Sequence, residues 1–356
     1  MNTEKTPLVV AVTGLNAIDS PGPGIAVIRA LRDGLDQPLR IVGLAYENLE
    51  PGIYMEGMCD CVYQVPYPAA GAEVLFNAIR RINETEKIDV IIPNFDAELY
   101  NFITIAPRMK ALGIHSFLPG LEMFDARQKT NLFSFGQQHG LQVPKDKIIY
   151  SVYDLSQLGD EFDYPIVVKG KFYDAVVAYT LEQAQKAFYS ISAKWGLPII
   201  VQEFIHGTEL NIAALGDGEG NAISIIPMRK MYITDKGKAW AGITLEDDAL
   251  HDLARKFISA TNWRGGFEVE IMKTKKDELY IMEVNPRFPA WIYLSAGAGQ
   301  NQPAALVKMA LGEKVPAFTS YDVGKLFIRY AWDHIVDVSR FQQFAAFGHL
   351  QNNITV

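Results

Sequence analysis

Two apolar segments, residues 266–272 and 280–285, constrain the fold of this 356-residue chain more than any other part of its sequence. The charged run between them, residues 273–278, predicts a turn, so the two segments are expected to form a hairpin. Acidic side chains interrupt both strands at alternate positions, which places them on one face of the hairpin. Strands this apolar are expected to be buried, and buried carboxylates need a cation or another partner.

Glu270, Glu283 and Asn285 are expected to converge on that face. Such hard oxygen ligands suit Mg²⁺ when the ion keeps some waters and takes its other ligands from substrate phosphates. Pro286 ends the second strand, so Arg287 begins a loop that runs in a different direction. A surface hairpin with glutamates on its solvated face is the structural alternative. The pattern otherwise predicts phosphoryl transfer from a nucleotide.

The stretch from Glu283 to Arg287, together with Glu270 on the preceding strand, resembles the metal-binding hairpin of the ATP-grasp superfamily. That superfamily joins carboxylates to amines through acyl phosphates, and the resemblance is strongest to its carbamoyl-phosphate-synthase-like and peptide-ligase members. It implies that Glu270, Glu283 and Asn285 bind Mg²⁺ or Mn²⁺ and that Arg287 meets the transferred phosphate. Glu268 shares a strand face with Glu270 and is an alternative first metal ligand.

Two lysines match the phosphate-binding positions of that superfamily and imply ATP as the nucleotide. Lys169 ends an apolar strand expected over 164–169, and Lys129 lies in a helix expected over 125–138. A lysine ammonium is a compact point charge that suits phosphate, although most lysines are simply solvated. The loop after Lys169 contains one glycine where relatives have several, so Lys171 and other side chains would replace backbone amides, or phosphate closure would be weaker.

The segment after the strand expected over 199–204 resembles the adenine-binding hinge of the same superfamily. The resemblance implies that Glu203 and Ile205 contribute backbone groups and that Glu209 holds the ribose hydroxyls. Gln202 and Phe204 flank these groups and are counted with them as nucleotide-binding residues. A strand, a turn and a solvated glutamate would be the structural alternative.

Arg229 and Lys230, at the end of another strand, are expected to neutralise a transferring phosphoryl group, although adjacent cations are commonly just solvated. Residues 288–301 are expected to line the acceptor end of the site, with Trp291 and Tyr293 packing against a substrate side chain. The small residues there would otherwise only permit tight helix packing.

Alternating strands and helices at the N-terminus predict a parallel, Rossmann-like sheet. The segments are residues 8–12, 24–31, 41–44, 74–82 and 89–93. Glycines near residues 14–24 do not fit a dinucleotide motif and are expected to serve the turn and close helix packing. Asp96 and Glu98 follow the last strand, where they could face a substrate, although Asp96 is better placed as a helix N-cap.

The expected organisation is α/β, with an α+β C-terminal part. A Rossmann-like pre-ATP-grasp domain would occupy residues 1–119, and an ATP-grasp domain would occupy 120–318 with a lid-like subdomain over 145–205. The aromatic tail, residues 319–356, would pack on this body or on a partner subunit of a homodimer.

Composition narrows the class of function further. A net charge of −8 argues against a nucleic-acid surface, and no apolar run approaches the ~18 residues of a membrane span. Cys59 and Cys61 are expected to be ordinary thiols, so we expect a soluble, cytoplasmic protein. The sequence predicts an ATP- and Mg²⁺-dependent ligase acting on small-molecule or peptide carboxylates and amines. A bicarbonate-activating, carbamoyl-phosphate-type enzyme and a non-catalytic nucleotide- or peptide-binding protein are the alternatives.

Overall fold

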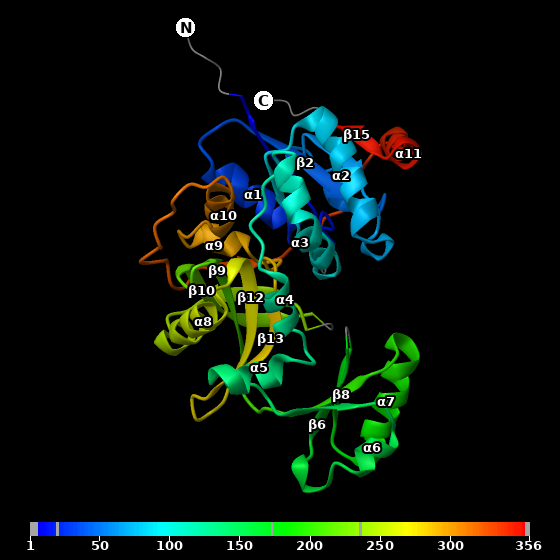
Figure 1. The fold of residues 1–356 in the computed structure, drawn as a ribbon, viewed down its shortest axis with the longest axis vertical. Coiled ribbons are helices and arrows are strands. Elements are labelled where there is room, and N and C mark those ends of the chain that lie inside the picture. The colour runs from blue at the N-terminus through cyan, green and yellow to red at the C-terminus, as the bar shows by residue number, and fades with distance from the viewer. Residues whose placement is uncertain (1–5, 19–20, 172–173, 235–236, 353–356) are drawn as a thin grey trace. The chain divides into compact units, whose positions relative to one another are not determined.

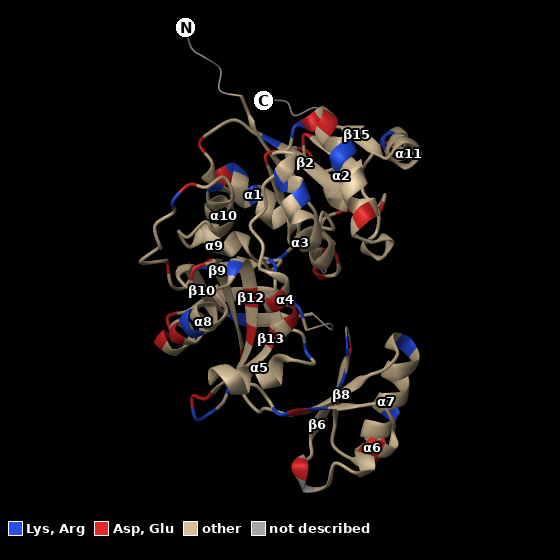
Figure 2. Cartoon of the chain, in the orientation of Figure 1, with Lys and Arg blue, Asp and Glu red and all other residues tan. Residues whose placement is uncertain are grey.

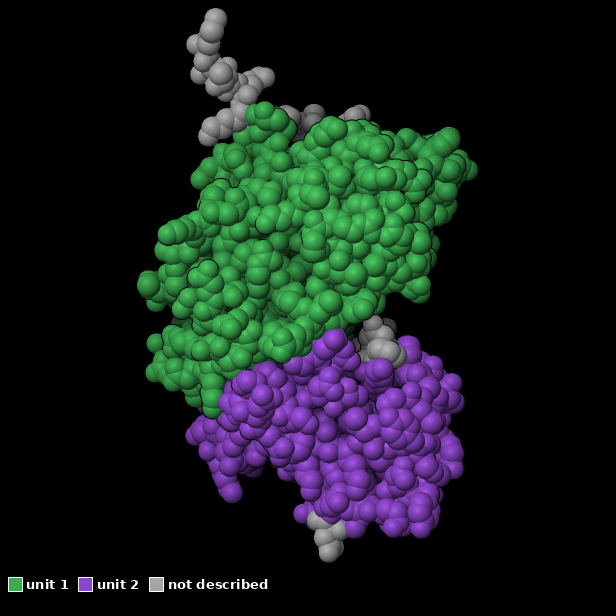
Figure 3. Space-filling view, in the orientation of Figure 1, with its two compact units in different colours: residues 1–124, 211–268, 285–356 green, residues 125–210, 269–284 purple. Residues whose placement is uncertain are grey.

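The computed structural model of the chain describes residues 6–18, 21–171, 174–234 and 237–352. The chain forms two compact units, which Figure 3 colours separately. Unit 1 comprises residues 1–124, 211–268 and 285–356, and unit 2 comprises residues 125–210 and 269–284.

A five-stranded sheet organises the N-terminal part of unit 1 (Figure 1). Its order is β15-β3-β2-β1-β4, in which β1 to β4 pair in parallel and β15 pairs antiparallel with β3. The strands are β1 Leu8–Val12, β2 Leu39–Ala45, β3 Cys61–Gln64, β4 Val90–Ile92 and β15 His349–Gln351. The parallel α/β arrangement confirms the fold class predicted for this region.

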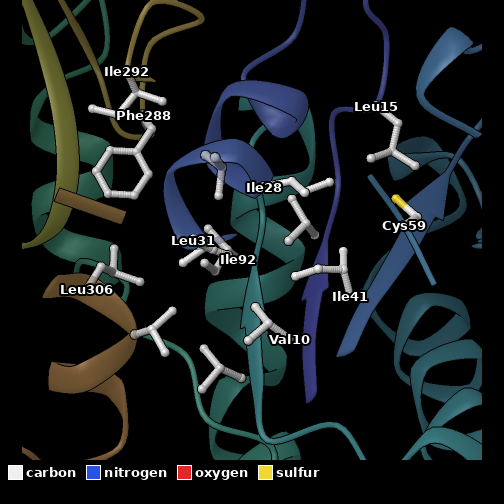
Figure 4. Close-up of a cluster of buried hydrophobic side chains, with 14 of the residues drawn as sticks. Val10, Leu15, Ile28, Leu31, Ile41, Cys59, Ile92, Phe288, Ile292 and Leu306 are labelled. Carbon is white, nitrogen blue, oxygen red and sulfur yellow. The ribbon is translucent and has the colours of Figure 1, made fainter. Parts of the chain in front are cut away.

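Alternate residues of this sheet face two apolar layers. Val10 packs with Ile28 and Leu31 of helix α1 (Gly24–Gly34), as Figure 4 shows. Val9 lies on the opposite face, in a cluster with residues of α2 (Ala72–Glu86) and α3 (Asp96–Ala111). This period of two is the reason that uniformly apolar strands such as β1 are buried on both sides.

Gly24 shows why the N-terminal glycines are needed. A Cβ atom on Gly24 would lie 2.3 Å from the carbonyl oxygen of Thr13, and the Gly24 amide donates to the Gly14 carbonyl at 3.0 Å. The glycine therefore serves close packing of α1 against the end of β1, as the sequence indicates.

A six-stranded sheet has the order β13-β12-β9-β10-β11-β14. The strands are β9 Thr208–Asp217, β10 Ala222–Ile233, β11 Ala239–Thr244, β12 Arg264–Lys273, β13 Leu279–Asn285 and β14 Leu326–Ile328. The helices that follow or precede them in unit 1 are α8 Asp248–Thr261, α9 Tyr293–Gly297, α10 Gln302–Ala310 and α11 Val338–Phe347. β12 and β13 are the hairpin predicted from the sequence.

One face of β12 is anchored by aromatic packing. The ring of Phe267 lies 5.2 Å from that of Trp263 and 5.3 Å from that of Phe257 on α8. Because side chains alternate along a strand, this packing directs Glu268 to the opposite face.

Unit 2 contains a four-stranded antiparallel sheet of order β5-β8-β6-β7. Its elements are β5 Asp146–Ile149, α6 Tyr153–Ser156, β6 Ile166–Gly170, β7 Ala175–Ala178, α7 Leu181–Trp195 and β8 Ile199–Glu203. Buried residues of α7, such as Phe188 and Ile191, share an apolar cluster with Val168 and Val201 of the central strands.

The helix expected over residues 125–138 is wrong as a single element. The chain forms α4 (Leu121–Ala126) and α5 (Leu132–His139), separated by a turn. No large apolar residue lies between these helices, and Asn131 Nδ2 caps the break by donating to the Asp125 carbonyl at 3.0 Å. Lys129 therefore lies in a turn instead of a helix.

Two expectations drawn from composition concern the cysteines and the possibility of a membrane span. Cys59 and Cys61 are both buried free thiols. Among the described helices, none is long and apolar enough to cross a bilayer.

Candidate active site

Glu268 is a buried acid of unit 1 with several protein partners. Its side chain is buried and accepts hydrogen bonds from the Asn211 amide at 2.8 Å and from the Trp291 indole at 2.7 Å through the same oxygen. Its second oxygen accepts from Asn285 Nδ2 at 3.2 Å and lies 3.6 Å from a guanidinium nitrogen of Arg287. Both oxygens are thus occupied by protein donors, which leaves little capacity for a metal ion.

This arrangement distinguishes the two acids of β12. Figure 2 shows acidic residues along the β12–β13 hairpin. Glu268 lies in unit 1 and is saturated by hydrogen bonds, whereas Glu270 lies in unit 2 and is only half-buried. Glu270 is the better candidate for the first metal ligand.

Arg287 is fixed from two sides in unit 1. Its Nε lies 2.9 Å from a carboxylate oxygen of Asp96, and its side chain is 17% exposed. The expected N-cap role of Asp96 is wrong: the N-cap of α3 is Phe95, and Glu98 accepts from the Phe95 amide at 2.9 Å. A longer carboxylate three residues into the helix can reach back to the cap, which frees Asp96 to pair with Arg287.

The structure gives Trp291 and Tyr293 partners within unit 1, and their substrate-packing role stays a prediction. Trp291 is buried against Glu268, and the Tyr293 hydroxyl donates to Asp33 at 2.5 Å beneath the guanidinium of Arg29. Trp291 is therefore buried in unit 1, whereas Tyr293 is only partly buried.

Lys169 is the predicted phosphate-binding residue on the sheet of unit 2. It lies on the central strand β6, and its ammonium donates to Gln202 Oε1 of the neighbouring β8 at 2.6 Å. Burial lowers the pKa of Lys169 to about 8, and the positive charge of Lys129 contributes to the same direction. A desolvated ammonium held in place by a neighbouring strand is well suited to a phosphate oxygen.

Two carboxylates lie within electrostatic reach of the predicted phosphate-binding lysines of unit 2. Lys129 Nζ lies 3.4 Å from Glu283 Oε2, and both side chains are partly enclosed. Glu283 and Glu270 both oppose the lowering of the Lys169 pKa, so each lies within electrostatic reach of that ammonium. The structure thus brings the two predicted phosphate-binding lysines near two of the predicted metal-binding acids.

The predicted hinge follows β8 directly. Glu203 ends that strand and is exposed, whereas Ile205 is buried beyond the strand end. Phe204 packs edge to face with His206, and Glu209 is half-buried near the start of β9. The backbone around Phe204 and Ile205 therefore lies outside the strand ladders, as an adenine-binding segment would require.

The remaining predicted cations are placed differently from one another. Arg229 and Lys230 alternate on β10, so they point to opposite faces and cannot act as a pair. Arg229 is exposed, whereas Lys230 is half-buried and donates to the Gly237 carbonyl at 3.3 Å. Lys171 is exposed in the glycine-poor loop, of which residues 172 and 173 lie outside the described residues.

The metal set can be tested against the chemistry of its donors. Within the described ranges, no group of three or more His, Cys, Asp or Glu side chains is placed to hold a metal ion. The predicted set has two acids and an asparagine, so it would need phosphate and water oxygens to complete a magnesium shell. Such a set fits a metal that arrives with a nucleotide.

Three groups near these residues were missed by sequence analysis. Asp146 on β5 has a buried, unpartnered oxygen, and burial raises its pKa to about 6. Lys238 and Arg329 of unit 1 lie within electrostatic reach of Glu268. Only Arg329 carried a usable signal, since it directly follows the short apolar run of residues 326–328.

Comparisons with known proteins find ATP-grasp enzymes as relatives. Residues 197–327 match a family described as ATP-grasp in the biosynthetic pathway with Ter operon. The N-terminal section of a carbamoyl phosphate synthase large chain from Methanopyrus kandleri is 22% identical over 81% of this chain and 54% of its own length. A D-alanine–D-alanine ligase from Bordetella petrii is 23% identical over 42% of this chain and 50% of its own length.

The fold is shared with solved structures at low identity. A biotin carboxylase from Campylobacter jejuni superposes with a TM-score of 0.70 and 16% identity, covering 92% of this chain and 75% of the other. These comparisons support membership of the ATP-grasp superfamily, and the chain has the ATP-grasp fold. It spans about half of the length of the two relatives compared by sequence.

Proposed function

We propose that this protein is an ATP-dependent ligase that joins a carboxylate to an amine. The observation that carries the proposal is the cluster of Lys129, Lys169 and Glu283 in unit 2, in which cations for phosphate adjoin a carboxylate suited to a divalent ion. No side-chain nucleophile is required, because catalysis would consist of positioning and charge neutralisation.

The reaction would have two steps. A carboxylate oxygen of the acid attacks the γ-phosphorus of ATP, which forms an acyl phosphate and releases ADP. The amine nitrogen then attacks the acyl carbon, a C–N bond forms as the C–O bond to phosphate breaks, and the amine loses a proton. Arg287, held by Asp96 and Glu268, would stabilise the negative charge of the acyl phosphate.

The nucleotide would be held by residues of unit 2. Lys129 and Lys169 would contact phosphate oxygens, the backbone of Glu203 and Ile205 would contact adenine, and Glu209 would accept from the ribose hydroxyls. Gln202 would keep Lys169 in place. Glu270, Glu283 and Asn285 would hold Mg²⁺, whose charge would neutralise the phosphates when it is bound.

A second candidate function activates bicarbonate in place of an organic acid. The similarity to a carbamoyl phosphate synthase section over 81% of the chain favours it. To separate the candidates, the protein is incubated with ATP, Mg²⁺ and a pool of amino acids and peptides, or with bicarbonate. ADP release that depends on an amine, with a new amide seen by mass spectrometry, supports ligation. Bicarbonate dependence supports the second candidate, and nucleotide binding without turnover refutes both.

The lowered pKa of Lys169 predicts how nucleotide affinity depends on pH. Below about pH 8 the ammonium carries its charge and contacts phosphate, and above that pH it must first take up a proton. ADP affinity, measured by calorimetry, is therefore expected to fall by up to roughly tenfold per pH unit as the pH rises through 8. In Lys169→Arg the guanidinium stays charged, so the inflection should disappear. A wild-type affinity that stays flat between pH 7 and 9.5 would remove Lys169 from the phosphate site.

A further inference from the structure

Three cations line one face of the β10–β11–β14 ladder in unit 1. Gly242 of β11 pairs with Lys230 on one side and with Phe327 on the other. Directly paired residues of antiparallel strands share a face, and positions two apart along a strand share it too. Lys238 and Trp240 therefore lie on the same face as Gly242 and Lys230.

Arg329 joins this face from β14. Its amide donates to the Trp240 carbonyl at 2.9 Å, one position beyond the pairing of Ala241 with Ile328, so Arg329 lies opposite Trp240. Lys238 and Arg329 are thus diagonal neighbours whose positions are fixed by backbone hydrogen bonds. They come from segments far apart in the sequence.

These two cations have charged neighbours but no ion pair. Burial lowers the pKa of the Arg329 guanidinium, and the nearby Glu268 carboxylate opposes that shift. Desolvation and the positive charges of Arg287 and Arg329 lower the pKa of Lys238. Across the described residues, neither Lys238 nor Arg329 forms a salt bridge, and Arg329 stacks only over the Phe327 ring.

The acids nearby are already committed to other partners. Asp96 pairs with the Nε of Arg287, and Glu268 accepts from Asn211, Trp291 and Asn285. Among the described residues of this part of unit 1, positive charge therefore exceeds negative charge. Partly desolvated like charges without a counterion are unfavourable, and an anionic ligand would remove that cost.

We propose that the acid substrate of this enzyme carries a second anionic group, a carboxylate or a phosphate, which Lys238 and Arg329 bind while Arg287 serves the reacting carboxylate. The inference rests on the proposed ligase function and specifies its substrate class. An arginine fork and a lysine point charge together suit either anion. The half-buried Trp240 between them would cover the carbon chain that links the two anionic groups.

The test compares matched acids that differ in the second charge. Succinate is compared with butyrate, L-glutamate with L-norvaline, and O-phospho-L-serine with L-serine, each with an amino-acid pool, ATP and Mg²⁺. For each pair we compare the acid concentration that gives half-maximal ADP release. We expect this concentration to be lower for the doubly anionic member by roughly tenfold or more. The carboxylate and phosphate pairs show which second group the site prefers. Equal use of both members of every pair would overturn the proposal.

Two variants and a control locate the effect. Arg329→Gln and Lys238→Gln should each raise the half-saturating concentration of the preferred diacid by roughly tenfold or more and leave that of the matched acid without the second anionic group unchanged. Lys325→Gln is the control, because Lys325 is 50% exposed and pairs with Asp322. Affinity for ADP should not change in any of them. If Arg329→Gln weakens ADP binding instead, the two cations bind the nucleotide phosphates and the proposal is overturned.

Direct binding separates this inference from the proposed reaction. The same acids are titrated calorimetrically into the ADP-loaded protein. Selective binding of a diacid that requires Arg329, without ADP release by any acid, retains the anion site and refutes the ligase reaction. Absence of selective binding and of selective ADP release overturns the substrate class.

Discussion

Replacing Glu283 by glutamine is expected to lower ATP turnover by about two to three orders of magnitude, because a metal ion at the phosphates is worth several kcal/mol. Glutamine keeps the shape of the side chain but removes the charge that faces Lys129 at 3.4 Å and opposes the lowered pKa of Lys169. Turnover is measured as ADP release at saturating Mg²⁺. Calorimetry of ADP binding with and without Mg²⁺ gives a second measurement, in which the variant should lose the gain in affinity that Mg²⁺ confers.

A matched substitution on the same hairpin controls for this change. Glu278 is exposed in the turn between β12 and β13, and its carboxylate accepts from the Thr274 hydroxyl at 3.3 Å. Glu278→Gln makes the same chemical change away from any predicted ligand and should keep turnover and the Mg²⁺ effect within about twofold. Near-normal turnover in Glu283→Gln would remove Glu283 from the metal site.

The sequence predicts the fold well where local pattern and tertiary structure agree. Strand β1 begins and ends at the residues expected, and the β12–β13 hairpin forms where alternating acids interrupt apolar segments. The helix expected over residues 125–138 fails because its middle has no apolar residue to pack, so a capped turn replaces it. Strands β14 and β15 have three residues each. They form because neighbouring strands pair with them, and such long-range pairing cannot be read from a short stretch of sequence.

Site residues could be predicted from the sequence where they lie on a recognisable strand or hairpin motif. Lys169, Glu270 and Glu283 could be named from strand patterns and the ATP-grasp resemblance, and the structure brings them within electrostatic reach of one another. Partners that arrive from other elements could not be named. Asp96 pairs with Arg287 across most of the chain length, and Arg329 reaches Glu268 from β14.

Glu268 and Glu270 of β12 show the same limit of prediction from sequence. Sequence periodicity places Glu268 and Glu270 on one face and cannot rank them as metal ligands. Hydrogen bonds from Asn211, Trp291 and Asn285 occupy the oxygens of Glu268, which favours Glu270 as the proposed metal ligand. We propose that Glu268 instead orients Asn285 and Arg287.

A glutamine at position 268 is therefore expected to reduce turnover by about 10- to 100-fold, the usual effect of removing a partner that orients a metal ligand. An amide offers one acceptor oxygen where the carboxylate offers two, and its NH₂ group would face donors from Asn285 or Trp291. It also removes the negative charge 3.6 Å from Arg287. Turnover is measured as ADP release, and folding is followed by the thermal unfolding midpoint.

Two comparisons separate positioning by Glu268 from a purely structural contribution. Trp291→Phe removes one donor to Glu268 but leaves its charge beside Asn285 and Arg287, so it should lower turnover much less. In Glu268→Gln the affinity for ADP alone should stay within about twofold, whereas the Mg²⁺ concentration needed for half-maximal turnover should rise, because the Asn285 amide is no longer held. If turnover, ADP affinity and the unfolding midpoint all fall together, Glu268 stabilises the fold and does not position the site. The shift in Mg²⁺ dependence is decisive, since loss of folded protein lowers the maximal rate without changing the concentration at which Mg²⁺ acts.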